Sequence, residues 1–275
     1  MAEATQTVNW STVEGIIYRA ESSGGVVGAT IVAPTEDTFE YNGARRFRAA
    51  SIMKIPLMIE IFRQIERGER SLDDRYTLKE AEKAPGSGVM LHLHDGMVFT
   101  LHDLLYLMIS ISDNTATNLL IDMAGMQQVN RTMRELGMVN STLGRKMLGR
   151  PVEDEQQENW ATPDDYVTAV QAILDGQAAS EESCQQMIAL LELQQNRRRI
   201  ARHLPEEKSI RWGTKTGSIR GVTNDVGFIS TPQETLVLAI FCENFPDQHA
   251  AEAVIGAVSR AAMAATGIVK PLYTS

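Results

Sequence analysis

The sequence predicts an α+β fold: an antiparallel sheet flanked by helices, with an inserted lobe made only of helices. Strand-like segments occur near both ends of the chain, and the long middle stretch keeps the apolar spacing of helices. With 275 residues, 43% of them hydrophobic, the chain is long enough for two lobes that share a core. We expect residues 1–48 and 206–275 to form the sheet lobe and residues 49–205 the helical lobe, with the candidate site between them.

The N-terminal part is expected to form one helix and up to three strands. Ser11-Thr-Val-Glu14 has the capping-box pattern, which predicts a helix that extends to about Ala20. β-branched and apolar residues predict a buried strand at 26–33. Turn residues then lead into strands at 38–42 and 45–48.

The middle of the chain changes to helical periodicity. A helix is predicted from Ser51 to Gly68, with an irregular first turn because Pro56 lacks an N–H group. Further helices are expected after Thr100, at 115–123, at 126–136, after Thr162 and after Ser180. The polar, nonperiodic stretch 143–159 predicts a long loop, and such loops are usually functional or disordered. Strands return at 210–217, 222–230 and 234–241, before a last helix at 248–266.

Composition excludes several classes of protein. The net charge is -9 and the one marked basic run is Arg197-Arg198-Arg199, so nucleic acid is not an expected partner. No run of about 18 apolar residues and no signal peptide is visible. Cys184 and Cys242 are expected to be free, buried thiols. His92 and His94 lack a third ligand, so we expect no metal and no cofactor.

Ser51 and Lys54 form the first of three short motifs with chemical potential. They lie three residues apart at the head of a predicted helix, which places both side chains on one face. A serine hydroxyl becomes a good nucleophile when a neighbour accepts its proton. Alone, this pair is more often a capping serine and a solvated lysine.

The second motif, Ser112-Asp113-Asn114, lies between two predicted helices. Ser112 is suited to relay a proton to a leaving nitrogen, and Asn114 to donate a hydrogen bond to a substrate carbonyl. Asp113 is expected to hold the loop through backbone N–H groups. Alone, the motif also fits an ordinary helix N-cap.

The third motif, Lys215-Thr216-Gly217-Ser218, lies in a predicted strand. Lys215 and Thr216 suit a substrate carboxylate, and Gly217 permits close approach to the backbone. The N–H groups of Ser218 and Ser51 are suited to form an oxyanion hole. An edge strand protected by lysine is the structural alternative.

Arg220, just after this motif, is a further candidate for carboxylate binding, and a surface salt bridge is an equal alternative.

The order, spacing and context of the three motifs resemble those of class A β-lactamases and penicillin-binding proteins. Ser112-Asp-Asn-Thr-Ala-Thr-Asn118 and Thr223-Asn-Asp225 extend the resemblance over nearly the whole chain. It implies the β-lactamase/transpeptidase fold and a serine hydrolase that is acylated through Ser51. The implied catalytic residues are Ser51, Lys54, Ser112 and Lys215. The implied substrate-binding residues are Asn114, Thr216, Gly217, Ser218 and Arg220.

One departure from the family pattern bears on turnover. Class A enzymes use a loop glutamate to activate the water that releases the acyl group. The family segment Leu-x-Arg-x-Glu corresponds to Leu143-Gly-Arg145-Lys-Met147, so a methionine occupies the glutamate position. Charged loop residues that remain as replacements are usually only solvated; they are Glu153, Asp154, Glu155 and Glu158.

We therefore predict a β-lactamase whose acyl-enzyme accumulates. The alternatives are a D-Ala-D-Ala peptidase or esterase of the same fold, and a β-lactam sensor or trap that acylates without turnover. The expected ligand is a small β-lactam or peptide-like molecule, and the expected oligomeric state is a monomer. The resemblance implies a bacterial protein that is periplasmic or secreted, whereas the lack of a signal peptide leaves the cytoplasm open.

Overall fold

A five-stranded antiparallel sheet organises the computed structural model, which describes residues 7–150 and 157–269. The strand order is β2-β1-β9-β8-β7, so β7 lies at an edge. The strands are β1 (Val26–Val32), β2 (Thr38–Tyr41), β7 (Arg211–Ile219), β8 (Val222–Ser230) and β9 (Thr235–Glu243). The predicted α+β class is confirmed.

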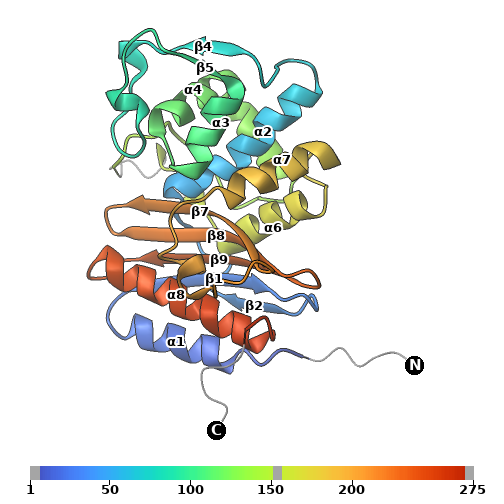
Figure 1. Cartoon of the computed structure of the whole chain (residues 1–275). Coiled ribbons are helices and arrows are strands. Elements are labelled where there is room, and N and C mark those ends of the chain that lie inside the picture. The colour runs from blue at the N-terminus through green and yellow to red at the C-terminus, as the bar shows by residue number, and fades with distance from the viewer. Residues whose placement is uncertain (1–6, 151–156, 270–275) are drawn as a thin grey trace.

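One face of the sheet is covered by the two terminal helices, α1 (Ser11–Glu21) and α8 (Gln248–Ala265) (Figure 1). The central strand β9 shows how the sequence specifies this arrangement. Leu238 and Ile240 pack into the core beneath α1 and α8, whereas Ala239 and Phe241 pack into the core on the opposite face. Successive side chains of a strand point to opposite faces, so an uninterrupted apolar run is buried on both.

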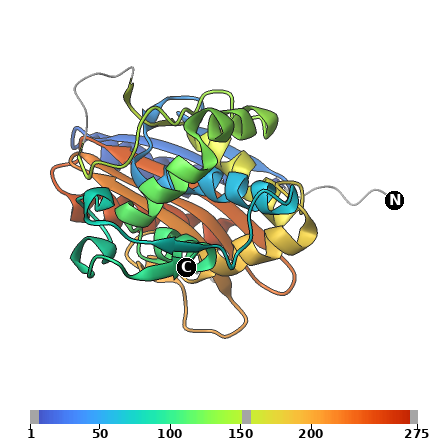
Figure 2. The same ribbon diagram turned by 90° about the horizontal axis from the view of Figure 1, so that it is seen from above.

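The other face carries the helices of the middle of the chain, which lie over the strands in the view from above (Figure 2). These helices are α2 (Lys54–Glu66), α3 (Leu101–Ser110), α4 (Asn114–Ala124), α5 (Met126–Glu135), α6 (Pro163–Leu174) and α7 (Glu181–Glu192). Four short strands pair in two small ladders: β3 (Phe47–Arg48) with β6 (Trp160–Ala161), and β4 (Arg75–Thr77) with β5 (Val98–Thr100). Short 3₁₀ helices are η1 (Ala50–Met53), η2 (Glu80–Glu82), η3 (Met90–His92) and η5 (Ile200–His203).

Most predicted caps are confirmed. The side chains of Thr100, Thr162 and Ser180 each accept a hydrogen bond from the backbone N–H three residues later. The capping box at Ser11 is wrong: Ser11 is already helical, and Trp10 is the N-cap residue without a side-chain cap. The strand predicted at 45–48 is short and pairs with β6, outside the large sheet.

The division into a sheet lobe and a helical lobe stays a proposal. One hydrophobic cluster spans the junction: Phe241 of β9 contacts Phe47 and Tyr166 edge-to-face, each at a ring-centroid distance of 5.9 Å. Cys184 and Cys242 are buried and free, as predicted. Across the described ranges, no helix combines the length and the apolar character that a bilayer crossing requires.

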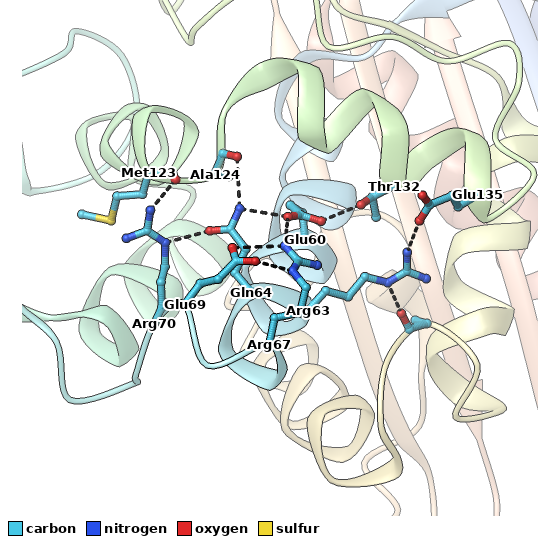
Figure 3. A network of polar contacts seen from close by, with 11 residues as sticks. Glu60, Arg63, Gln64, Arg67, Glu69, Arg70, Met123, Ala124, Thr132 and Glu135 are labelled. Atoms are coloured by element: carbon cyan, nitrogen blue, oxygen red, sulfur yellow. Dashed lines mark hydrogen bonds and ion pairs between the residues drawn. The ribbon is translucent and has the colours of Figure 1, made fainter.

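The far end of α2 is fixed by a buried polar network (Figure 3). Glu60, which is fully buried, accepts hydrogen bonds from Gln64 (2.9 Å), Arg67 (2.9 Å) and, on α5, Thr132 (2.6 Å). Gln64 also donates to Ala124 O at the end of α4 (3.1 Å). Because buried carboxylates require such partners, this network fixes α2 against α4 and α5. The opposite ends of α2 and α4 carry Lys54 and Asn114.

Candidate active site

Ser51 lies in a tight turn that β7 presses against. It belongs to η1, and Lys54 is the first residue of α2, one turn later. A Cβ on Gly217 would stand 2.9 Å from Ala49 O and 3.1 Å from Ser51 N. Gly217 is therefore needed for contact between β7 and the serine turn, a reason beyond the predicted approach of substrate.

Lys54 is completely buried and surrounded by oxygen atoms. Its Nζ lies 2.7 Å from Ser112 O, 2.9 Å from Ser112 Oγ and 3.1 Å from Asn114 Oδ1. Burial, helped by the positive charge of Lys215, holds the pKa of Lys54 well below its usual value, while Asp113 opposes this shift. This lysine therefore meets the electrostatic condition for a base.

The Ser112–Asn114 segment is held by Asp113, as predicted. Asp113 caps α4 by accepting from Ala116 N (3.0 Å), and its other oxygen accepts from Val89 N (2.6 Å) and Met90 N (2.8 Å). Ser112 has a positive φ of 62°, a conformation uncommon for a residue with a Cβ. These bonds stabilise the turn that points Ser112 toward Lys54.

The side-chain amide of Asn114 both accepts and donates a hydrogen bond. Its Oδ1 accepts from Lys54, and its Nδ2 donates to Pro85 O at 2.8 Å. A side-chain amide has two N–H donors. The predicted bond from Asn114 to a substrate carbonyl is thus compatible with the bond to Pro85.

Lys215 is also completely buried, and its Nζ donates to Thr216 O at 2.9 Å. Burial lowers the pKa of Lys215 to about 7, although Asp225 opposes the shift. Lys215 does not line the cleft that holds Ser51, whereas Thr216 and Ser218 do. Its charge therefore acts on the site from behind the strand surface and depends on pH.

A cleft of about 470 Å³ is lined by four of the nine predicted site residues. Ser51, Ser112, Thr216 and Ser218 all line it, and so do the residues of the segment 194–199. Arg220 is exposed and lines a neighbouring cavity of about 440 Å³, which shares Ser218 with the cleft. The structure thus places Arg220 beside the Ser51 cleft and not in it.

Arg199 is a site residue that sequence reasoning missed, since the basic run served only to judge nucleic-acid binding. Its side chain is almost fully buried and donates to Gly217 O (3.0 Å) and Asn224 O (2.6 Å). It also donates to Ser218 Oγ. Gly217 and Asn224 are paired across β7 and β8, so Arg199 fixes the strand edge next to Ser51. Nothing in a run of three arginines marks one of them as buried.

A smaller cavity of about 100 Å³ lies on the loop side of Ser51. Met147 lines it, and its backbone is fixed by Asn118, which accepts from Met147 N (2.7 Å) and donates to Met147 O (3.0 Å). Within the described residues, none of those lining this cavity is a carboxylic acid.

The candidate replacement glutamates divide into two groups. Glu158 is 2% exposed and forms an ion pair with Arg145 at 2.7 Å, and it does not line the loop-side cavity. Its contacts are those of a residue that fixes the loop. Glu153, Asp154 and Glu155 lie outside the described residues.

Comparisons with known proteins identify relatives over nearly the whole chain. The family described as "Beta-lactamase enzyme family" matches residues 11–266. The crystal structure of a β-lactamase from Sphaerobacter thermophilus is 61% identical, with a TM-score of 0.94, and the match covers 96% of this chain and 100% of that one.

More distant relatives carry the same description. An ancestral class A β-lactamase is 28% identical, with a TM-score of 0.82, and the match covers 92% of this chain and 99% of that one. The β-lactamase OXY-2 of Klebsiella oxytoca is 25% identical over 252 residues, covering 88% of this chain and 85% of its own.

Proposed function

We propose, for a chain that belongs to the β-lactamase enzyme family and is a serine hydrolase of the class A type, that Ser51 opens β-lactams. The reaction proceeds through an acyl-enzyme whose acyl group is hydrolysed slowly. The observation that carries the proposal is the environment of Lys54. It is a buried amine of lowered pKa, one turn after Ser51, in contact with a second hydroxyl, that of Ser112.

Hydrogen-bond capacity supports a proton path through Lys54. A neutral amine has two N–H donors and one lone pair. Ser112 O and Asn114 Oδ1 only accept, so they take the two N–H groups. The lone pair is then directed to a hydroxyl, and Ser51 and Ser112 are the candidate hydroxyls of the motifs. We propose that Lys54 takes the proton of Ser51 as its oxygen attacks the lactam carbonyl.

The remaining groups fit the second half of acylation. Ser112 Oγ both donates and accepts, so it can pass a proton to the nitrogen that leaves as the amide bond breaks. The N–H groups of Ser51 and Ser218 are proposed to stabilise the oxyanion. Lys215, Thr216 and Asn114 are proposed to hold the substrate, and Arg220 is proposed as an accessory residue at the rim.

Among the residues that the structure describes, no carboxylic acid lines the loop-side cavity to act as the base for release of the acyl group. The loop-side cavity carries Met147 at the position where the family pattern has glutamate, and Glu158 is engaged with Arg145. A thioether accepts hydrogen bonds only weakly and cannot take a proton from water at neutral pH. We therefore propose that water attacks the ester slowly.

The nucleophile is tested with Ser51→Ala. Intact-mass spectrometry after brief exposure to penicillin should show one covalently bound antibiotic on the wild-type chain and none on Ser51→Ala. Full hydrolysis by Ser51→Ala would overturn the proposal. Parallel assays with nitrocefin, a simple ester and a D-Ala-D-Ala peptide separate the β-lactamase from a peptidase or esterase of the same fold.

Cellular location and assembly are part of the proposal. The relatives are bacterial proteins, and we propose a periplasmic or secreted monomer. Fractionation of the source cells and the sedimentation coefficient of the purified chain test these two points.

A further inference from the structure

Ser87 is an exposed residue that lines both cavities around Ser51. Its hydroxyl donates to Ser112 O at 2.6 Å and lies 3.4 Å from Asn114 Oδ1. Both oxygens are also hydrogen-bond acceptors for Lys54. Ser87 and Lys54 therefore share the same two acceptors.

The segment that carries Ser87 is locked against the Ser112–Asn114 turn. Gly86 and Gly88 both have φ of +106°, and a Cβ on them would lie 2.4 Å from Asn114 Nδ2 and 2.2 Å from Asp113 Oδ2, respectively. Asn114 N also donates to Ser87 O at 2.9 Å. The position of the Ser87 hydroxyl is thus fixed by the backbone on both sides.

This geometry has an electrostatic consequence. An acceptor oxygen that already receives a hydrogen bond has less capacity to stabilise a neighbouring ammonium, because the positive end of the O–H dipole faces the same oxygen. Resting on the function proposed above, we propose that Ser87 is a positioning residue that weakens the hold of Ser112 O and Asn114 Oδ1 on the charged form of Lys54. It thereby keeps the amine available as a base.

The charged groups that act on Lys54 come from two elements. Lys215 on β7 disfavours the ammonium, and Asp113, before α4, favours it. The hydroxyl of Ser87 is neutral and acts between them through the shared oxygens. Its removal should therefore raise the pKa of Lys54, because the two oxygens would then interact more strongly with the ammonium.

The test uses Ser87→Ala in the full-length protein, with Ser87→Thr as the variant that keeps the hydroxyl. Ser23→Ala is the matched control, since Ser23 is also exposed and donates to a backbone carbonyl, Ala20 O, far from the site. Titration of the Lys54 ε-carbon by ¹³C NMR, assigned with Lys54→Met, reports the pKa without turnover. The rate of acylation by penicillin is measured from pH 5 to 9.

We expect Ser87→Ala to raise the Lys54 midpoint and to move the acid limb of the acylation profile to higher pH. Relative to wild type at the same pH, acylation should fall about three- to tenfold at pH 6, and the ratio of the two rates should return to one at alkaline pH. Ser87→Thr and Ser23→Ala should match the wild type. An unchanged midpoint and profile in Ser87→Ala, or a uniform loss at every pH, would overturn the inference. Failure of the wild type to acylate would overturn the proposed function instead, and the NMR midpoint would still test Ser87.

Discussion

The two cavities beside Ser51 differ in chemistry. The larger cleft combines the hydroxyls of Ser112 and Thr216 with two buried lysines just behind its surface. The loop-side cavity has a methionine where the family pattern has a glutamate, and its described lining residues include no carboxylic acid. In class A enzymes a loop glutamate activates the water that hydrolyses the acyl-enzyme, whereas Lys54 is the base proposed here for its formation. We propose from this contrast that the groups for acylation are retained and that, among the described residues, the base for rapid release is missing.

Removing Lys54, the base proposed for acylation, should have the largest effect. Lys54→Met is expected to slow acylation by about 10²- to 10⁴-fold, the usual contribution of a positioned general base. The fold should survive, because methionine fills a similar buried volume without a charge. Stopped-flow kinetics with nitrocefin measure the acylation rate, and a thermal melt measures the stability of the fold. Lys208→Met, at an exposed lysine, is the control. Acylation within a factor of about three of wild type would show that another group takes the proton.

Adding a carboxylate to the loop-side cavity should speed hydrolysis of the acyl-enzyme. Met147→Glu is expected to raise the rate of deacylation by about 10²-fold, while acylation changes little. Met147→Gln is the matched control, since it has similar size and polarity but no basic carboxylate. The decay of the adduct, followed by intact mass after excess antibiotic is removed, gives the rate. Equal decay for the two variants would contradict the assignment of this position.

The buried ammonium of Lys215 on β7 should make kcat/KM for carboxylate substrates depend on pH. Because the pKa of Lys215 is lowered to about 7, its ammonium is lost as the pH rises above that value. For a substrate with a carboxylate, kcat/KM should fall about fivefold between pH 7 and pH 8, and for a neutral ester this fall should be absent. Parallel pH profiles for the two substrates would show that Lys215 does not act on the carboxylate.

Arg220 should have the smallest effect. It is exposed and lies in the cavity next to the Ser51 cleft, where solvent screens its charge. Arg220→Ala is expected to change kcat/KM for penicillin by less than about twofold. A loss of about tenfold or more would mean that the substrate extends from the cleft into the second cavity.

Part of the site identified from the sequence is positioned by local spacing, whereas Lys215 to Ser218 are identified through the resemblance of their motif to a family pattern. Ser51 and Lys54 are one helical turn apart, and Asp113 caps the helix that follows it, so the chain itself brings these groups into position. The α+β class follows in the same way from the period of the apolar residues. The ends of strands β7, β8 and β9 are therefore predicted to within a few residues of those observed.

Residues whose roles depend on distant parts of the chain could not be predicted in this way. Arg199 is buried because the carbonyls of Gly217 and Asn224 and the carboxylate of Glu252 surround it. The role proposed for Ser87 depends on two glycines, which let its segment pack closely against the turn at Ser112. Glu158 forms an ion pair with Arg145. None of these contacts leaves a periodic or local trace in the sequence.

Time-resolved intact-mass spectrometry of the wild-type chain during penicillin turnover shows whether acylation is faster than release of the acyl group. We predict that nearly every molecule carries one bound antibiotic within the first turnover and keeps it through the steady state. Rapid consumption of penicillin by a chain that stays unmodified throughout would contradict slow hydrolysis of the acyl-enzyme. It would require a base in or near the loop-side cavity.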